Sequence, residues 1–483
     1  MEIHAAIALG LVLYLVVTTG VSFLMMSRVR KPADYLMAGR GLPFWALAGT
    51  ITGTCIGTGV IIGGSGLAYQ HGWAGCAYPI GLGLGTLLVG VFYGRMRRYN
   101  FMTLSEEVAC YYGANRLIFE FSNVSIFLSQ VCWLTVQIMG GAAVLGAVTG
   151  LGPRTCVVIA GAAKAAISIP GGMKAVVYTD VVQTIILFCG FGALTSRALH
   201  QSGGVSGLVS AMPAGYGSFL GVNSLGGWNV ASLIVVMILS VVADPGRRLT
   251  MYSARTEGGA RWSMIASGLA VLGFAVVIGI AGMFAYSLNP GIPKPDQTLP
   301  WLVMNVLPPW LAAFVVVAVV SGMSSAANAT AAASGSFFVR HIFPLVTGRY
   351  PRQPLVVGRR ALSVVFLTAT CMALYTQNIV AFVTKFLPLT MSGLAIIILV
   401  GRFWRRATWQ GALAALIATP AVSVGCSFYF SKSLPNPSIP ATLGGVLALV
   451  LVSLVTPPTA TSFEQVAETL ARQRQEIETT GGH

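Results

Sequence analysis

The chain has 483 residues, of which 55% are hydrophobic and 9% are charged, and its mean hydropathy is +0.78. Soluble domains carry about 25% charged residues, so this composition excludes a soluble multidomain enzyme, and the same hydrophobicity excludes a disordered chain. A polytopic membrane protein remains. The eight cysteines show neither a CxxC motif nor the spacing of a metal site, and we interpret them as small apolar residues within helices.

A membrane-spanning helix needs about 20 mostly apolar residues. Thirteen such runs follow one another along the chain, or twelve if the two that meet near Tyr375 form one helix. The first run lacks the small-residue cleavage pattern of a removable signal peptide. We therefore predict an all-α polytopic membrane protein with about 13 transmembrane helices, near residues 5–26, 43–69, 74–94, 118–148, 153–169, 175–198, 228–246, 262–287, 309–338, 361–376, 378–400, 409–430 and 439–456.

Basic residues orient these helices, because loops that stay in the cytoplasm carry the excess of Lys and Arg. With the N-terminus outside and the C-terminus inside, 23 of the 29 Lys and Arg residues fall in inside loops or in the tail. The first inside loop, for example, contains Arg28, Arg30, Lys31 and Arg40. Topology thus explains the formal net charge of +16, with anionic lipid headgroups as the partner. Nucleic acid is not implied.

Three ionisable residues lie inside apolar runs: Asp180, Lys164 and Lys385. Such a group costs a few kcal/mol in hydrocarbon, so it normally faces a cavity, a partner or an ion path. Asp180 is therefore a candidate ion ligand, although a structural pair with a neighbouring hydroxyl or Lys would also explain it. Either lysine could instead extend to the interface or bind a backbone carbonyl.

The second run is unusually rich in glycine, with seven glycines between residues 49 and 66. Each glycine disfavours a helix interior by about 1 kcal/mol relative to alanine. Two interpretations stay open. The glycines could allow close helix packing, or the helix could be broken so that its free carbonyls coordinate a cation, with the hydroxyls of Thr52, Thr54 and Thr58 nearby.

The ninth run carries a cluster of small polar residues. Ser321, Ser325 and Asn328 share one helical face by their spacing, and Ser324 is adjacent. Hydroxyl and amide oxygens without a carboxylate suit a hard monovalent cation better than Zn²⁺ or Ca²⁺. Packing of helices through small polar residues is the alternative.

Six segments are notable for their order and spacing along the chain: GRGL (39–42), GGMKAVVYTDVVQ (171–183), RLTMYSAR (248–255), DQTLP (296–300), MSS (323–325) and SLVTPP (453–458). Together they resemble the sodium:solute symporter family over nearly the whole chain. The resemblance implies a leucine-transporter-type fold, in which two five-helix repeats of inverted topology each begin with a broken helix.

The resemblance also implies how the chain is divided and what it does. We expect a peripheral N-terminal helix (1–30), a first inverted repeat (43–200), a second inverted repeat (228–400), two C-terminal helices (409–457) and a short cytoplasmic tail (458–483). The expected activity is secondary active transport in a bacterial inner membrane, by sodium-coupled symport of a small organic solute. Na⁺ is the coupling ion, no other cofactor is expected, and the chain is not an enzyme.

The resemblance also implies a sodium site, whose ligands can be assigned by position. The implied ligands are the backbone carbonyls of Gly53, Ile56 and Ser321 and the hydroxyls of Ser324 and Ser325. Some members bind a second sodium ion, which here would use Asp180, Ser324 and Asn328. Ala327 lacks the hydroxyl found there in such members, so this second ion site is left open.

The family's solute contacts come from the broken helix and from three other core helices. In this chain the corresponding candidates are Cys55, Thr58, Trp133, Gln137, Asn229 and Phe382. The third core helix has no Arg that could bind a carboxylate through two hydrogen bonds. A carboxylate solute would therefore need Lys385, the dipole of the broken helix or the ion itself.

Two alternatives remain beside sodium symport. The first is proton-coupled or ion-independent transport by the same fold. The second is an intramembrane serine hydrolase, because GGSG at 63–66 matches a serine-peptidase pattern. Ser65 would then need a base within hydrogen-bond reach, and His71 and His200 lie near predicted outer ends or loops.

Overall fold

The computed structural model describes residues 3–26, 41–221, 224–376, 378–429, 436–459 and 461–480, without the side chains of residues 22–26, 170–175, 381, 388 and 473–480. The predicted basic loop from Arg28 to Arg40 therefore lies outside the described residues, as do Gly39 and Arg40 of the first family segment. The side chains of the GGMK portion at 171–174 are likewise outside them.

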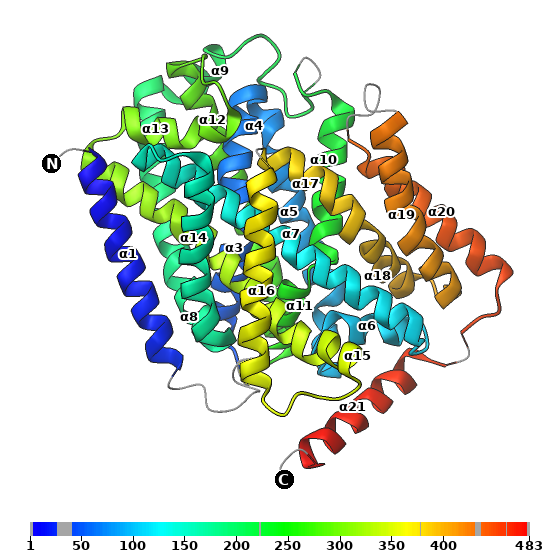
Figure 1. The fold of residues 1–483 in the computed structure, drawn as a ribbon. Coiled ribbons are helices and arrows are strands. Elements are labelled where there is room, and N and C mark those ends of the chain that lie inside the picture. The colour runs from blue at the N-terminus through cyan, green and yellow to red at the C-terminus, as the bar shows by residue number, and fades with distance from the viewer. Residues whose placement is uncertain are drawn as a thin grey trace.

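The described residues form a bundle of helices, in which the extended pairing is an isolated bridge between Leu42 and Ala254 (Figure 1). The α-helices are α1 (Ile3–Met26), α3 (Phe44–Cys55), α4 (Ser65–His71), α5 (Ala77–Tyr93), α6 (Leu104–Tyr111), α7 (Arg116–Thr149), α8 (Pro153–Ser202), α9 (Gly204–Ser210), α10 (Gly227–Val242), α11 (Pro245–Tyr252), α12 (Glu257–Leu288), α13 (Thr298–Val306), α14 (Pro309–Phe337), α15 (Phe343–Thr347), α16 (Pro354–Tyr375), α17 (Ile379–Leu387), α18 (Gly393–Phe403), α19 (Trp409–Tyr429), α20 (Ser438–Val455) and α21 (Phe463–Thr480).

Short segments of other helical type join some of these elements. Three are π-helical and extend a neighbouring α-helix: η2 (Gly59–Gly64), η6 (Phe338–Ile342) and η7 (Pro388–Ser392). Three are 3₁₀ turns: η3 (Gly72–Cys76), η4 (Gly94–Tyr99) and η5 (Pro295–Gln297).

Ten helical segments among the described residues are long and apolar enough to cross a membrane, or eleven if α10 and α11 count as one span. The count of 13 is not confirmed, because several predicted runs are divided or merged. The second run is interrupted after α3, which has 12 residues. Two other runs fall within α8, whose 50 residues would measure about 75 Å if straight, more than twice the hydrocarbon thickness.

Both predicted helix breaks are present. The first follows Cys55, where Ile56 leaves helical geometry with φ −90° and ψ 59°, and the helix resumes as η2. The second separates α10 from α11, which meet at a 45° bend at Ala243 and Asp244. Asp244 caps α11 through its side chain, which accepts from the N–H groups of Gly246 and Arg247.

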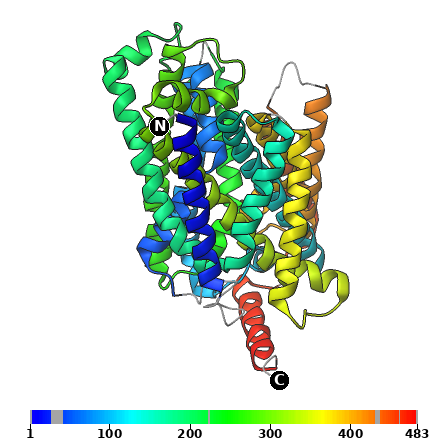
Figure 2. The same ribbon diagram turned by 60° about the vertical axis from the view of Figure 1, so that its left-hand side comes forward.

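The broken helices lie in the interior of the bundle, between peripheral helices. α1 stands at one edge, against α8 and α14, and α19 and α20 stand at the opposite edge (Figures 1 and 2). Leu9, Leu13 and Val16 of α1 are exposed, as expected of a helix that faces lipid. The N- and C-terminal ends lie at opposite faces, as an odd number of spans requires, while which face is outside stays a prediction.

The predicted tail contains a helix that the composition did not reveal. Ser462 and Gln465 form a reciprocal capping box, in which each backbone N–H donates to the other's side chain, at 3.0 and 3.3 Å, and α21 follows. Phe463 packs against Tyr99 and Tyr111 with ring centroids 5.0 and 5.2 Å apart. The S-x-x-Q spacing at 462–465 was a signal that could have predicted this helix.

Candidate sodium and solute sites

The end of α3 touches α14 and α8 through glycine. A Cβ placed on Gly53 would overlap the Thr184 hydroxyl and would lie 2.8 Å from Ser325 Oγ. A Cβ on Gly322 of α14 would lie 2.8 Å from the carbonyl oxygen of Ile56. Because glycine leaves this space free, the break of α3 lies directly against the serine-bearing face of α14. The structure therefore brings together the segments that carry the five predicted sodium ligands.

Buried oxygens without hydrogen-bond partners gather at this junction. They are Ser321 Oγ, Ser325 Oγ and both carboxylate oxygens of Asp180, and all three residues are completely buried. The Ser325 hydroxyl is close enough to interact with the Asp180 carboxyl, although the two form no hydrogen bond of ordinary geometry. An unsatisfied buried polar group costs about 1–3 kcal/mol, so these oxygens need a partner.

The donor set fits Na⁺. Hard cations take oxygen ligands, and the junction offers hydroxyl, carbonyl and carboxylate oxygens. In the described part of the chain, no group of three His, Cys, Asp or Glu residues could hold a transition metal. The assignment of individual ligands stays a prediction.

Three further polar residues surround the junction. The Thr184 hydroxyl donates to the carbonyl of Gly49 (2.9 Å). Gln183 Nε2 donates to the Tyr14 hydroxyl (2.7 Å), which lies beside Ser321 and Ser324. Thr184 could have been found one helical turn after Asp180, whereas Tyr14 gave no signal because α1 lies outside both predicted repeats.

Asn328, the remaining residue of the predicted second ion site, is engaged elsewhere. Its side-chain oxygen accepts a hydrogen bond of 2.7 Å from Ser168 Oγ. The amide therefore links α14 to the first half of α8. Its second lone pair remains for an ion, and the second ion site stays a prediction.

A small buried cavity of about 20 Å³ lies beside the break of α3. Three of the predicted solute contacts line it: Cys55, Trp133 and Gln137. Thr58 is joined to it, because its backbone N–H donates to Gln137 Oε1 (3.1 Å). Tyr78, Asp244 and Arg247, which were not predicted from the sequence, also line the cavity.

The other candidates lie elsewhere. Asn229 stands near the start of α10 and donates to the Leu225 carbonyl (2.9 Å). It precedes the α10–α11 break by about 14 residues, or about 21 Å of helix, which explains its absence from the cavity lining. Phe382 stacks on Phe386 with ring centroids 4.4 Å apart. Lys385 is exposed and Lys164 is buried against Gly141 of α7, so neither lines this cavity.

A wider vestibule of about 890 Å³ opens among segments at the same face as the N-terminus of α1. Arg154, Lys294 and Asp296 line it. Burial raises the pKa of Asp296 above its ordinary value, partly offset by the hydrogen bond from the Ile379 N–H (3.3 Å) and by the Lys294 ammonium. This vestibule is large enough for a small organic molecule.

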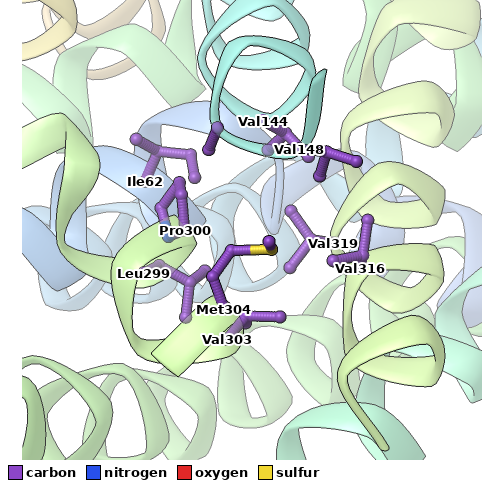
Figure 3. Close-up of a pocket in the computed structure, with 10 residues that line it drawn as sticks. Ile62, Val144, Val148, Leu299, Pro300, Val303, Met304, Val316 and Val319 are labelled. Atoms are coloured by element: carbon purple, nitrogen blue, oxygen red, sulfur yellow. The ribbon is translucent and has the colours of Figure 1, made fainter. Parts of the chain in front are cut away.

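An apolar layer adjoins the vestibule. Figure 3 shows side chains from η2, α7, α13 and α14, among them Ile62, Val144 and Val319, around a cavity of about 10 Å³. The cavity shares Pro300 and Met304 with the vestibule. Such a layer keeps water out of this part of the bundle, because a dry apolar cavity of this size does not favour a water molecule.

The geometry does not support a serine nucleophile. The Ser65 hydroxyl donates to the backbone carbonyls of Ile61 (2.6 Å) and Ile62 (3.1 Å). These bonds are the usual helix back-bonds of serine. No hydrogen bond joins Ser65 to a histidine among the described residues, so the GGSG segment is part of a helix.

The comparison with protein families agrees with this geometry: the model of the sodium:solute symporter family matches residues 35–419. The chain belongs to the sodium:solute symporter family. It is similar to the sodium/pantothenate symporter of Escherichia coli K12, with 25% identity over 433 residues, or 85% of this chain and 88% of the relative. It is also 25% identical to the sodium/glucose cotransporter of Vibrio parahaemolyticus over 471 residues, covering 84% and 82% of the two chains.

Solved structures confirm the fold class. A Na⁺-coupled sialic acid symporter superposes with a TM-score of 0.79 at 18% sequence identity, covering 95% of this chain and 98% of that one. The prediction of an integral membrane transporter of this family, rather than an enzyme, is confirmed, and the family points to Na⁺ as its coupling ion. The apolar helices and the bacterial relatives likewise support the inner membrane.

Proposed function

We propose that this transporter couples inward movement of Na⁺ to uptake of a small organic solute by alternating access. The observation that carries the proposal is the set of buried, unpartnered oxygens of Ser321, Ser325 and Asp180 at the break of α3. A cation there satisfies the hydroxyls and balances the carboxylate. It also ties the end of α3 to α8 and α14, which favours the conformation with the solute site assembled.

Release follows from the same contacts. When Na⁺ leaves toward the cytoplasm, the oxygens lose their shared partner and the broken segment is free to separate from α14. The solute site is then disassembled and the solute dissociates. Coupling therefore requires that Na⁺ and the solute both bind one conformation more tightly than the other.

Uptake into proteoliposomes tests the proposal. The names of the relatives make pantothenate, glucose and sialic acid the first solutes to screen. Uptake should rise with an inward Na⁺ gradient and should fall when K⁺ replaces Na⁺. Uptake that is indifferent to Na⁺ in every solute tested would refute sodium coupling.

Proton coupling is the second candidate, because the buried, unpartnered carboxyl of Asp180 could carry a proton in place of an ion. A pH gradient applied without Na⁺ distinguishes the two. Accumulation driven by protons alone, and abolished in Asp180→Asn, would favour this mechanism over sodium coupling.

A further inference from the structure

The solute cavity contains a buried arginine. Arg247 lies in the first turn of α11, directly after the second helix break, and is 4% exposed. Its guanidinium lies beside the thiol of Cys55 and shares the cavity with Gln137. A guanidinium stays charged in a protein, so this position holds a fixed cation beside the broken end of α3.

Asp244 engages one part of this guanidinium. Arg247 Nη1 donates to Asp244 Oδ2 (2.8 Å), while Asp244 Oδ1 accepts from the N–H groups of Gly246 (2.7 Å) and Arg247 (3.1 Å). Both carboxylate oxygens of Asp244 therefore have donors, and the arginine side chain is held in one orientation. Nε of Arg247 is buried without a partner. The edge formed by Nε and Nη2 matches the two oxygens of a carboxylate.

The neighbouring polar groups supply hydrogen-bond donors. The Tyr78 hydroxyl lines the same cavity, is buried and has no partner. The side-chain oxygen of Gln137 accepts from the Thr58 N–H. Arg247 Nε and the Tyr78 hydroxyl are therefore two buried donors without an acceptor in this cavity, and leaving a buried donor unpaired costs about 1–3 kcal/mol.

We propose that Arg247 binds the carboxylate of an anionic solute, with the Tyr78 hydroxyl as a second donor; this rests on the proposed transport function. Asp244 occupies one part of the guanidinium, and the remaining edge of Arg247 faces the solute carboxylate. The cavity of about 20 Å³ exceeds the 10–15 Å³ or so that one water needs. It therefore seats the head of the solute in place of water, and the cavity widens to admit the remainder.

The experiment compares carboxylates with their uncharged analogues. Thermal unfolding of the purified protein in Na⁺ is followed with lactate, nicotinate and pantothenate, and with the amide of each. At least one acid should stabilise the protein more than its amide. Arg247→Lys and the charge-balanced double variant Arg247→Gln/Asp244→Asn should weaken binding of that acid by about tenfold or more, with a smaller effect on the amide. Arg255→Gln removes an exposed cation near the same helix and should keep the preference.

The outcomes separate this proposal from the transport function. The shift caused by Na⁺ against K⁺ without solute tests the ion site, and its persistence in both Arg247 variants shows that they fold. Equal stabilisation by acid and amide, no stabilisation by any acid, or an acid preference that survives in Arg247→Lys would each overturn the role of Arg247. Absence of a Na⁺ response in the parent, together with an Arg247-dependent acid preference, would refute sodium coupling and leave the carboxylate site standing.

Discussion

Replacing Ser325 by alanine should separate ion binding from folding. In the structure the Ser325 hydroxyl is completely buried and unpartnered, so removing it relieves an unsatisfied group. We therefore expect the Na⁺-free variant to gain about 1 kcal/mol in free energy of unfolding. Ser334 on the same helix is the matched control, because its equally buried hydroxyl donates to the Thr330 carbonyl (2.8 Å). Ser334→Ala should lose about 0.5–1.5 kcal/mol.

The response to Na⁺ should change in the opposite sense. At a Na⁺ concentration of 100 times Kd, binding stabilises a protein by about 2.7 kcal/mol. A hydrogen-bonding group that faces a charge contributes about 1.5–3 kcal/mol, so losing one ligand should raise Kd at least about tenfold. The stabilisation of Ser325→Ala at the same Na⁺ concentration then falls to about 1.4 kcal/mol or less.

Thermal unfolding in detergent, with Na⁺ or K⁺ at constant ionic strength, measures both quantities. Ser334→Ala should keep the full Na⁺ response despite its lower stability. The reasoning fails if Ser325→Ala lowers Na⁺-free stability as much as Ser334→Ala does and responds to Na⁺ like the parent. That result would mean that the Ser325 hydroxyl packs between helices and binds no ion.

Four other perturbations have expected outcomes. Asp180→Asn should reduce transport and the Na⁺-to-solute flux ratio; an unchanged rate and ratio would make the carboxyl purely structural. Gly53→Ala should abolish the Na⁺-induced thermal shift, because its Cβ overlaps two site hydroxyls, whereas Gly192→Ala, with open space around it, should not. Glu107 and Arg248 form a buried ion pair (3.3 Å), and Glu107→Ala would leave the Arg248 guanidinium without its counter-charge. This variant should lower the free energy of unfolding by about 3–5 kcal/mol in a denaturation series. Burial raises the folded-state pKa of Asp296, so the stability that this residue contributes is present at low pH and is lost as the pH rises through that pKa. The melting temperature should therefore fall as the pH rises above about 4, and Asp296→Asn should make this fall smaller.

Much of the ion site was predictable because it is encoded locally. Glycine spacing at 49–66 indicated a helix that could break, and the break after Cys55 lies within that stretch. The serine spacing on α14 marked one helical face, which does lie against Gly53. Asp180 was predictable because a carboxylate within an apolar run is costly in hydrocarbon and therefore indicates a cavity, a partner or an ion path. These signals depend on residue type and helical period, and both can be read directly from the sequence.

The solute cavity was less predictable because its lining comes from several helices. Cys55, Trp133 and Gln137 line it as expected, whereas Asn229 and Phe382 do not. From the sequence, Arg247 was assigned with other basic residues to an inside loop. In the structure it follows the bend between α10 and α11 and is buried in the interior of the bundle.

The sequence by itself determined that this chain is a helical membrane protein and which of its helices carry polar groups. Hydropathy and helical period suffice for this, because both are properties of consecutive residues. The tertiary structure alone decided which of those groups meet. Tyr14 lies beside Ser321 and Ser324 although its helix, α1, is outside both predicted repeats. Arg247 faces Cys55 across 192 positions of the chain. Such meetings are set by how helices pack, and packing depends on side-chain shapes from many segments at once.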